Sequence, residues 1–77
     1  METGSMRVLG EKGDTKYLWD KNQADEVEVA RRTFREFRDK GYQAFRAEGK
    51  EGTKGERIHD FDPAAERIIF VRPARGG

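Results

Sequence analysis

Between Ala24 and Phe37, apolar residues recur every three or four positions and charged residues fill the gaps. This spacing aligns the apolar side chains along one side of an α-helix. Asp25, Glu26 and Glu28 lie in the first turns, where the helix dipole favours negative charge, and Lys40-Gly41 follows the stripe, as at the end of many helices. We therefore expect one amphipathic helix from about Gln23 to Lys40. Its buried stripe would be Ala24, Val27, Ala30, Phe34 and Phe37.

The helix would begin at one of two competing N-caps. Asp20 has Gln23 three residues later, and Asn22 has Asp25 at the same spacing. Either pair imitates a capping box, in which two side chains satisfy free backbone N–H groups. The sequence does not choose between them.

Short runs of branched and aromatic residues lie on both sides of the helix and predict strands. The first two runs would form a hairpin closed by a loop of about five residues, Gly10–Asp14. Asp62-Pro63 has the residues of a type I turn before the last run. The five runs are Met6–Leu9, Thr15–Trp19, Tyr42–Ala47, Arg57–Phe61 and Glu66–Val71.

The order ββαβββ predicts an α+β domain, with one helix covering one face of a mixed or antiparallel sheet of four to five strands. The last run is the most apolar, so we place it in the middle of the sheet. Arg57–Phe61 is less apolar and fits an edge. The residues expected to face the helix, as far as alternation allows, are Trp19, Phe45, Phe61, Ile68 and Phe70.

The chain has 77 residues, enough for one domain. Met1–Ser5 looks like the remnant of an expression tag, because Gly-Ser stands before a second methionine, Met6. We therefore expect residues 1–5 outside the fold, a domain over residues 6–72 and a flexible C-terminal tail over residues 73–77.

The composition is polar, with 40% charged and 34% hydrophobic residues, but the charges nearly cancel to +1. The periodic apolar residues favour a folded chain over a disordered one. The absence of cysteine fits the cytoplasm. No run approaches the roughly 18 apolar residues of a membrane span, so no membrane partner is expected. The small net charge argues against nucleic acid as the main partner.

The residues that usually perform catalysis are scarce. Cysteine is absent, Ser5 is the only serine, and His59 is the only histidine. Alternation along a strand would send His59 and Asp60 to opposite faces, which leaves Asp62 as a poor third ligand for a metal. We therefore expect a surface histidine, no metal, no cofactor and no enzymatic activity.

Two features could bind phosphate. The predicted helix carries Arg31, Arg32, Arg35 and Arg38, but acids four residues away favour a solvated face of ion pairs. Gly49–Gly55 is rich in glycine and lysine, but it lacks the spacing of a phosphate-binding loop and joins two strands. We read both as structural features.

The carboxyl end, Arg75-Gly76-Gly77, is the sharpest feature. A terminal carboxylate that reacts must enter another protein's narrow active site, and glycines pass where side chains would clash. Pro73 would detach this segment from the last strand. Chance alone gives two terminal glycines in roughly 0.5% of chains. We interpret it as a conjugation tail.

The element order over residues 6–71, together with the Arg75-Gly76-Gly77 tail, resembles ubiquitin and the other β-grasp ubiquitin-like proteins. The resemblance implies that an activating enzyme adenylates the Gly77 carboxylate with ATP and that the carbonyl then passes to a thiol, a lysine or sulfide. It also implies a deconjugating protease as a partner. Arg75 and Gly76 would serve recognition and threading. Beyond the tail, no family motif matches residue by residue.

Two alternatives stay open. Several stretches resemble small bacterial and phage proteins, and this second resemblance brings no activity with it. The chain could then be a protein-interaction module that uses its open sheet face, with Tyr17 and Trp19 as aromatic anchors. The third alternative is a nucleic-acid-binding accessory protein. The stretches that resemble small bacterial and phage proteins are Gly13–Lys16, Trp19–Asp20, Lys40–Tyr42 and Phe61–Glu66.

Overall fold

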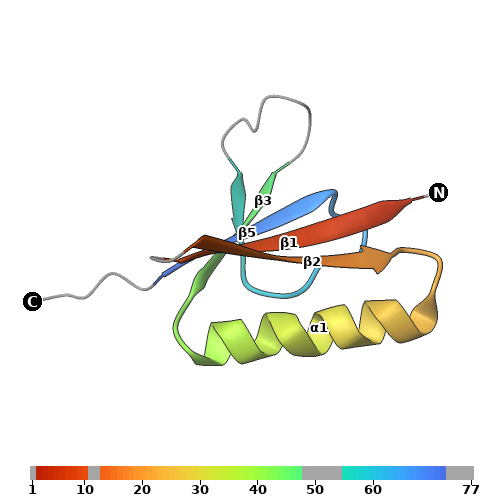
Figure 1. Cartoon of the computed structure of the whole chain (residues 1–77), viewed down its shortest axis with the longest axis horizontal. Coiled ribbons are helices and arrows are strands. Elements are labelled where there is room, and N and C mark those ends of the chain that lie inside the picture. The colour runs from red at the N-terminus through yellow and green to blue at the C-terminus, as the bar shows by residue number, and fades with distance from the viewer. Residues whose placement is uncertain (1, 11–12, 48–54, 73–77) are drawn as a thin grey trace, which may run out of the picture.

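A computed structural model describes residues 2–10, 13–47 and 55–72 of the chain (Figure 1). The order of its elements, ββαβββ, is the one that the sequence predicts. They are β1 (Thr3–Gly10), β2 (Gly13–Asp20), α1 (Ala24–Asp39), β3 (Gln43–Ala47), β4 (Glu56–Ile58) and β5 (Arg67–Val71).

The strands form one mixed sheet in the order β2-β1-β5-β3-β4. Strand β1 pairs antiparallel with β2 and parallel with β5, and β3 pairs antiparallel with both β5 and β4. The apolar strand β5 is central and β4 is at an edge, as predicted. Helix α1 covers one face of the sheet (Figure 1). Within the described part of the chain, no helix is long and apolar enough to cross a membrane.

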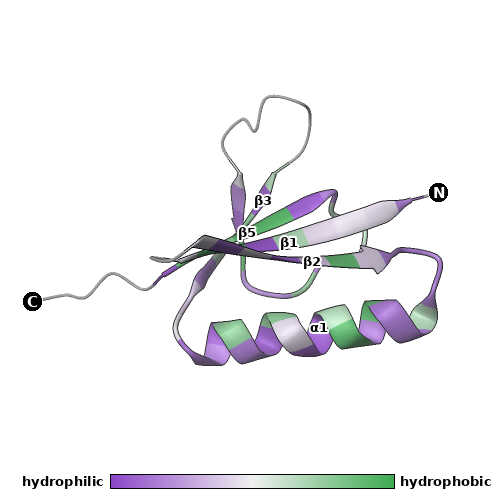
Figure 2. Cartoon of the chain, in the orientation of Figure 1, coloured by the Kyte–Doolittle hydropathy of each residue, from purple (hydrophilic) through white to green (hydrophobic). Residues whose placement is uncertain are grey.

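The core lies between α1 and the sheet. Apolar and polar residues are interleaved along α1, so that one side of the helix can be buried (Figure 2). The ring of Phe34 lies at the centre, with centroids 5.3 Å from Phe70 and 5.9 Å from Phe61. Aromatic pairs at such distances stabilise a core beyond their buried area. The largest fully buried side chains are Trp19, Phe34, Phe70, Met6 and Ile68.

Helix α1 ends in a Schellman motif, which Gly41, just after the C-cap Lys40, favours. Gly41 has a φ of 93°, a conformation that other residues rarely adopt. Its N–H donates to Arg38 O at 2.9 Å, and the Tyr42 N–H donates to Phe37 O at 3.0 Å. The rings of Phe37 and Tyr42 pack 5.2 Å apart beside the motif.

The N-terminal end of α1 differs from both predicted caps. Gln23 is the N-cap, and its side chain makes no capping hydrogen bond. Asp20 is instead used in the preceding turn, where its Oδ1 accepts from the Asn22 N–H at 2.8 Å. The Glu26 carboxylate reaches back to the Asp20 N–H, also at 2.8 Å. The turn therefore takes up both predicted capping residues.

Residues Thr3–Ser5, which the sequence analysis set outside the fold, lie inside β1. They pair with β2, and Ser5 also pairs with Arg67 of β5. Gly4 lies against the indole of Trp19, and a Cβ at this position would come 2.7 Å from Trp19 Cη2. The domain therefore begins at least three residues earlier than predicted. The tag-like composition of this segment gave no indication of its pairing.

Two further predictions need correction. Gly10 pairs with Gly13, so the β1–β2 strands run closer to the turn than a five-residue loop would allow. Phe45 is opposite Ile69 in the sheet, one position out of phase with the buried pair of Ala44 and Phe70. Alternation therefore turns Phe45 to the face that α1 does not cover.

Strand β4 is shorter than predicted. It ends at Ile58 because Phe61 turns inward to meet the core, where its ring centroid lies 5.1 Å from that of Trp19. The predicted turn after it is present, with the Ala65 N–H donating to Asp62 O at 3.1 Å.

Candidate functional site

The predicted conjugation tail continues from the central strand. Strand β5 ends at Val71 and Arg72 is the last described residue of the chain. Arg75, Gly76 and Gly77 lie outside the described residues. So does most of the glycine-rich stretch considered for phosphate binding, over residues 48–54.

Trp19 cannot be the surface anchor that the sequence suggested. Its side chain is only 1% exposed, and it packs between Gly4 and Phe61. The indole Nε1–H donates to Pro63 O at 3.3 Å, so its polar atom is also satisfied inside the fold. Its role is to join the end of β2 to the turn before β5.

Tyr17 stays accessible and lines a groove between β2 and α1. It is 36% exposed, with its ring centroid 6.2 Å from that of Phe37. Two of the most exposed large apolar residues line the same groove, Leu18 at 63% and Val29 at 58%. Asp25 and Glu26 stand at its helical side. The groove has a volume of about 260 Å³.

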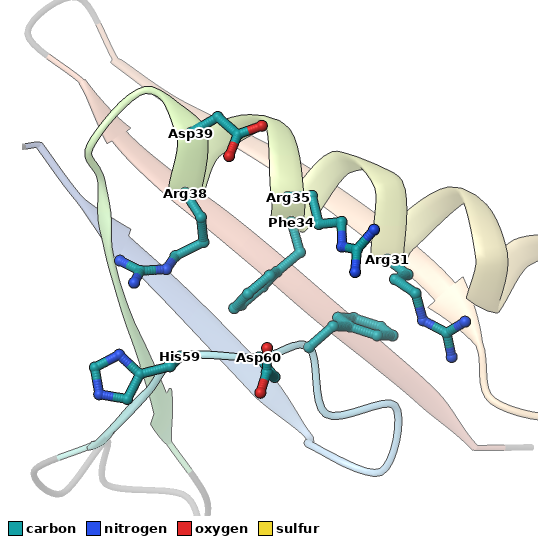
Figure 3. A pocket seen from close by; sticks show the side chains of 8 residues that line it. Arg31, Phe34, Arg35, Arg38, Asp39, His59 and Asp60 are labelled. Carbon is teal, nitrogen blue, oxygen red and sulfur yellow. The ribbon is translucent and has the colours of Figure 1, made fainter.

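A second and larger cleft lies between α1 and the segment that follows β4 (Figure 3). Its volume is about 510 Å³. One wall is helical and carries arginines spaced by four and three residues, which brings them to one side of α1. The other wall is the segment 59–61. The residues that line the cleft are Arg31, Phe34, Arg35, Arg38, Asp39, His59, Asp60 and Phe61.

Among the described residues, few of these charges are neutralised by an ion pair. Arg31 Nη1 lies 3.2 Å from Glu28 Oε1, in a pair whose side chains are about half exposed. Arg38 donates to the neutral Tyr42 carbonyl oxygen at 2.9 Å, which fixes the guanidinium without cancelling its charge. Among the described residues, Arg35 and Asp60 form no ion pair within 4.0 Å.

The cleft brings together residues that lie in separate parts of the sequence. The arginine spacing was visible, but the acids four residues away were expected to neutralise it. Within the described part of the chain, neither Arg32 nor Arg35 forms any of those pairs. His59 is exposed, as predicted, but the arginines that it shares the cleft with are 21 to 28 positions earlier in the sequence. Proximity of that kind follows from the packing of Phe61 on Phe34.

Asp62 belongs to a separate structural cluster rather than to a metal site with His59. Its Oδ2 accepts from Arg46 Nη1 at 2.8 Å and its Oδ1 accepts from the Ala64 N–H at 3.0 Å. The hydrogen bond from Arg46 holds the pKa of Asp62 below its usual value of 3.8; partial burial opposes this effect, and the Ala64 N–H adds to it. Among the described residues, no three His, Cys, Asp or Glu side chains are grouped to hold a metal ion.

No family model matches the chain, no curated protein is similar to it, and no solved structure matches its fold.

Proposed function

We propose that this chain is a β-grasp, ubiquitin-like modifier or sulfur carrier that acts through its Gly77 carboxylate. The observation that supports the proposal best is the parallel pairing of β1 with β5 in the order β2-β1-β5-β3-β4 beside a single helix. A simple antiparallel meander would have argued against it. The strand that leads toward Arg75-Gly76-Gly77 is the central one, paired on both sides.

In this function the domain supplies the surface that a partner enzyme recognises, and the partner enzyme performs the catalysis. The Gly77 carboxylate attacks the α-phosphate of ATP, forming an acyl-adenylate and releasing pyrophosphate. A thiolate of the activating enzyme then displaces AMP and forms a thioester. Attack by a lysine amine gives an isopeptide and regenerates the thiol. In the carrier variant, sulfide displaces AMP from the adenylate and leaves a thiocarboxylate. The domain's own side chains need perform none of these steps.

The number of residues after the last described strand limits how far the Gly77 carboxylate can reach from the domain. Five residues, Pro73 to Gly77, follow Arg72, and a chain of this length spans at most about 17 Å. The two final glycines offer no side chain to obstruct a narrow channel.

The test is incubation of the protein with ATP in lysate of its source cells, followed by mass spectrometry. We expect Gly77 joined to lysine side chains, or an intact chain in which sulfur has replaced one carboxylate oxygen. The matched control is the same protein with Gly77 as a carboxamide, which keeps every side chain and removes the acid. Equal signals from the two proteins, or none from either, would reject the proposal.

A second candidate function is a peptide-binding module, which the groove beside β2 favours. Strand β2 is at the edge of the sheet, so an extended peptide can add a strand to it. Tyr17, Leu18 and Val29 would receive its apolar side chains, and Asp25 would attract a basic residue. Val29→Asp should abolish capture of such a peptide. Leu9→Asp, at a 38% exposed apolar residue outside the groove, should not.

A further inference from the structure

The arginine-lined cleft has no role in the function proposed above, because neither conjugation nor strand addition uses it. We propose that it is a binding site for a phosphate monoester carried on a small apolar or aromatic body. Arg31 and Arg35 would hold the phosphate, and the body would lie against the ring of Phe61, while Arg38, which is turned away from the other two arginines, would add positive charge at the other end of the cleft (Figure 3).

The helix that carries the three arginines is held in place by its packing and by its C-terminal end. Helix α1 is anchored by Phe34, whose side chain is 1% exposed and contacts both Phe61 and Phe70. The Schellman motif fixes the last turn of the helix, and Arg38 is further held by its hydrogen bond to Tyr42 O. The backbone of the helical wall is therefore set before a ligand binds, whereas Arg31 and Arg35 are exposed and become ordered only on binding.

The charges in the cleft are available to a ligand. Arg35 has no ion-pair partner among the described residues, and the Arg31–Glu28 pair is half exposed, so solvent already weakens it. Asp39 lies at the top of the helix, away from His59 and Asp60 (Figure 3). Asp60 faces the helix from the opposite wall, and its carboxylate would repel a bound anion.

The chemistry of the walls selects the anion. Guanidinium groups match planar or tetrahedral oxyanions through paired N–H donors, and several of them together suit phosphate, which has three acceptor oxygens and carries close to two charges at neutral pH. A single carboxylate would satisfy fewer donors. On the opposite wall, His59 can donate one ring N–H to the phosphate, whereas the Asp60 carboxylate can only accept and opposes it.

The size of the cleft indicates that the ligand is more than the anion. Its volume of about 510 Å³ falls within the range of sites for small organic molecules, roughly 300–1,000 Å³. Phe61, which is only partly buried, lines it beneath the charged groups, so an apolar or aromatic body would find matching surface there. Phenyl phosphate has both parts and is therefore the probe of choice.

The experiment is a titration of the whole chain with phenyl phosphate. The NMR signals of the protein amides and of the single histidine ring report the binding. We expect shifts confined to the second half of α1 and to residues 59–61. Arg35→Gln should weaken binding about ten-fold, which corresponds to loss of one charge-assisted contact. Arg32→Gln removes an equal charge from the same helix outside the cleft and should change affinity less than two-fold.

Asp60→Asn should increase the affinity, and damage to the fold would decrease it, so the two effects can be told apart. Removal of the competing carboxylate should tighten phenyl phosphate binding several-fold. Weaker or unchanged binding in this variant, or equal effects of Arg35→Gln and Arg32→Gln, would overturn the site. Trp19 fluorescence and amide spectra of each variant show whether the fold is intact.

Two further probes test the class of ligand. Inorganic phosphate should bind more weakly than phenyl phosphate, and equal affinities would overturn the assignment of an apolar body. A single-stranded oligonucleotide that displaced phenyl phosphate at a lower concentration of phosphate groups would overturn the small-molecule assignment in favour of nucleic acid. None of these results depends on Gly77, so the site and the conjugation function fail or stand separately.

Discussion

At the scale of single residues, Arg46 fixes the segment that closes the core. Its guanidinium donates to Asp62 at 2.8 Å and to Glu56 at 3.2 Å. Asp62 in turn receives the Ala64 N–H, and the Trp19 indole donates to the carbonyl oxygen of the intervening proline. This chain of contacts holds the turn over Trp19, which lets Phe61 reach the core and form the floor of the arginine cleft.

The Asp62 carboxyl predicts how stability responds to acid. Its pKa is lower in the folded protein than its usual 3.8, so the folded state favours the ionised form. The contribution is complete above the unfolded pKa and is lost as the pH falls through the folded pKa. Urea unfolding between pH 6 and pH 2 should therefore show decreasing stability below about pH 4. Because both side chains are about one-third exposed, the loss should be on the order of 1 kcal/mol or less.

The control for this prediction compares two neutral amides. Asp62→Asn should lower the free energy of unfolding at pH 6 and reduce its further decrease below about pH 4, the acid limb of the profile. Asp60→Asn, whose carboxylate has no ion pair among the described residues, should leave that limb as it is. Parallel pH profiles for the two variants would contradict the assigned role of Asp62.

At the scale of elements, α1 has one well-formed end and one incomplete end. The C-terminal end has its Schellman hydrogen bonds and the ring contact between Phe37 and Tyr42. The N-terminal end has Gln23 at the N-cap, where no side chain accepts from the first free N–H groups. The helix therefore depends on its packing more at its start than at its end.

Gln23→Ser should stabilise the protein by about 0.5–1 kcal/mol, because a serine hydroxyl can accept from the free N–H groups of the first turn. Serine adds no charge beside Asp25 and Glu26, which an aspartate would. The urea midpoint measures the change. Gln23→Ala should leave stability nearly unchanged, since the present side chain makes no cap, and a serine variant no more stable than the alanine variant would disprove the prediction.

The elements also mark the limit of what the sequence predicts. The period of apolar residues and Gly41 locate the helix to within one residue at each end, because both signals are local. The N-cap was missed because Asp20 and Asn22 serve the preceding turn equally well. Trp19 was assigned to two environments, core and surface, and a strand pattern alone cannot choose between them. The arginine cleft depends on packing between α1 and the segment after β4, which no local pattern contains.

At the scale of the whole molecule, β1 joins the two halves of the sheet. It pairs with β2 on one side and with β5 on the other. Its first residues take part in both pairings, since Ser5 is opposite Leu18 on one side and Arg67 on the other. The order of the strands could not be predicted, because pairing of the first and last strands depends on contacts between distant parts of the chain.

A chain that begins at Met6 should therefore be much less stable than the full chain. It would lose the pairing of Thr3–Ser5 and the hydrogen bond from the Lys21 N–H to Glu2 O. Each backbone hydrogen bond contributes about 1 kcal/mol, and a core of this size supplies only about 3–5 kcal/mol. We expect a broad or absent urea transition, monitored by Trp19 fluorescence.

Point variants separate this role from simple chain length. Gly4→Ala in the full chain should cost about 1–3 kcal/mol, because the added methyl group meets the Trp19 indole. Thr3→Ala, on an exposed side chain beside it, should cost far less. Full stability of the shortened chain would mean that this segment is dispensable for the fold.

The parallel ladder between β1 and β5 also determines when the domain can assemble. Ser5 and Glu66 are hydrogen-bonded although 61 residues separate them in the sequence. During synthesis the hairpin and helix emerge first, with Met6 and Val8 facing a core that still lacks Ile68 and Phe70. The central strand is thus translated after the other described strands, and cooperative folding waits for it to insert between β1 and β3. Such distant pairing slows folding and leaves a nascent chain with an open sheet edge, on which ribosome-associated chaperones would act.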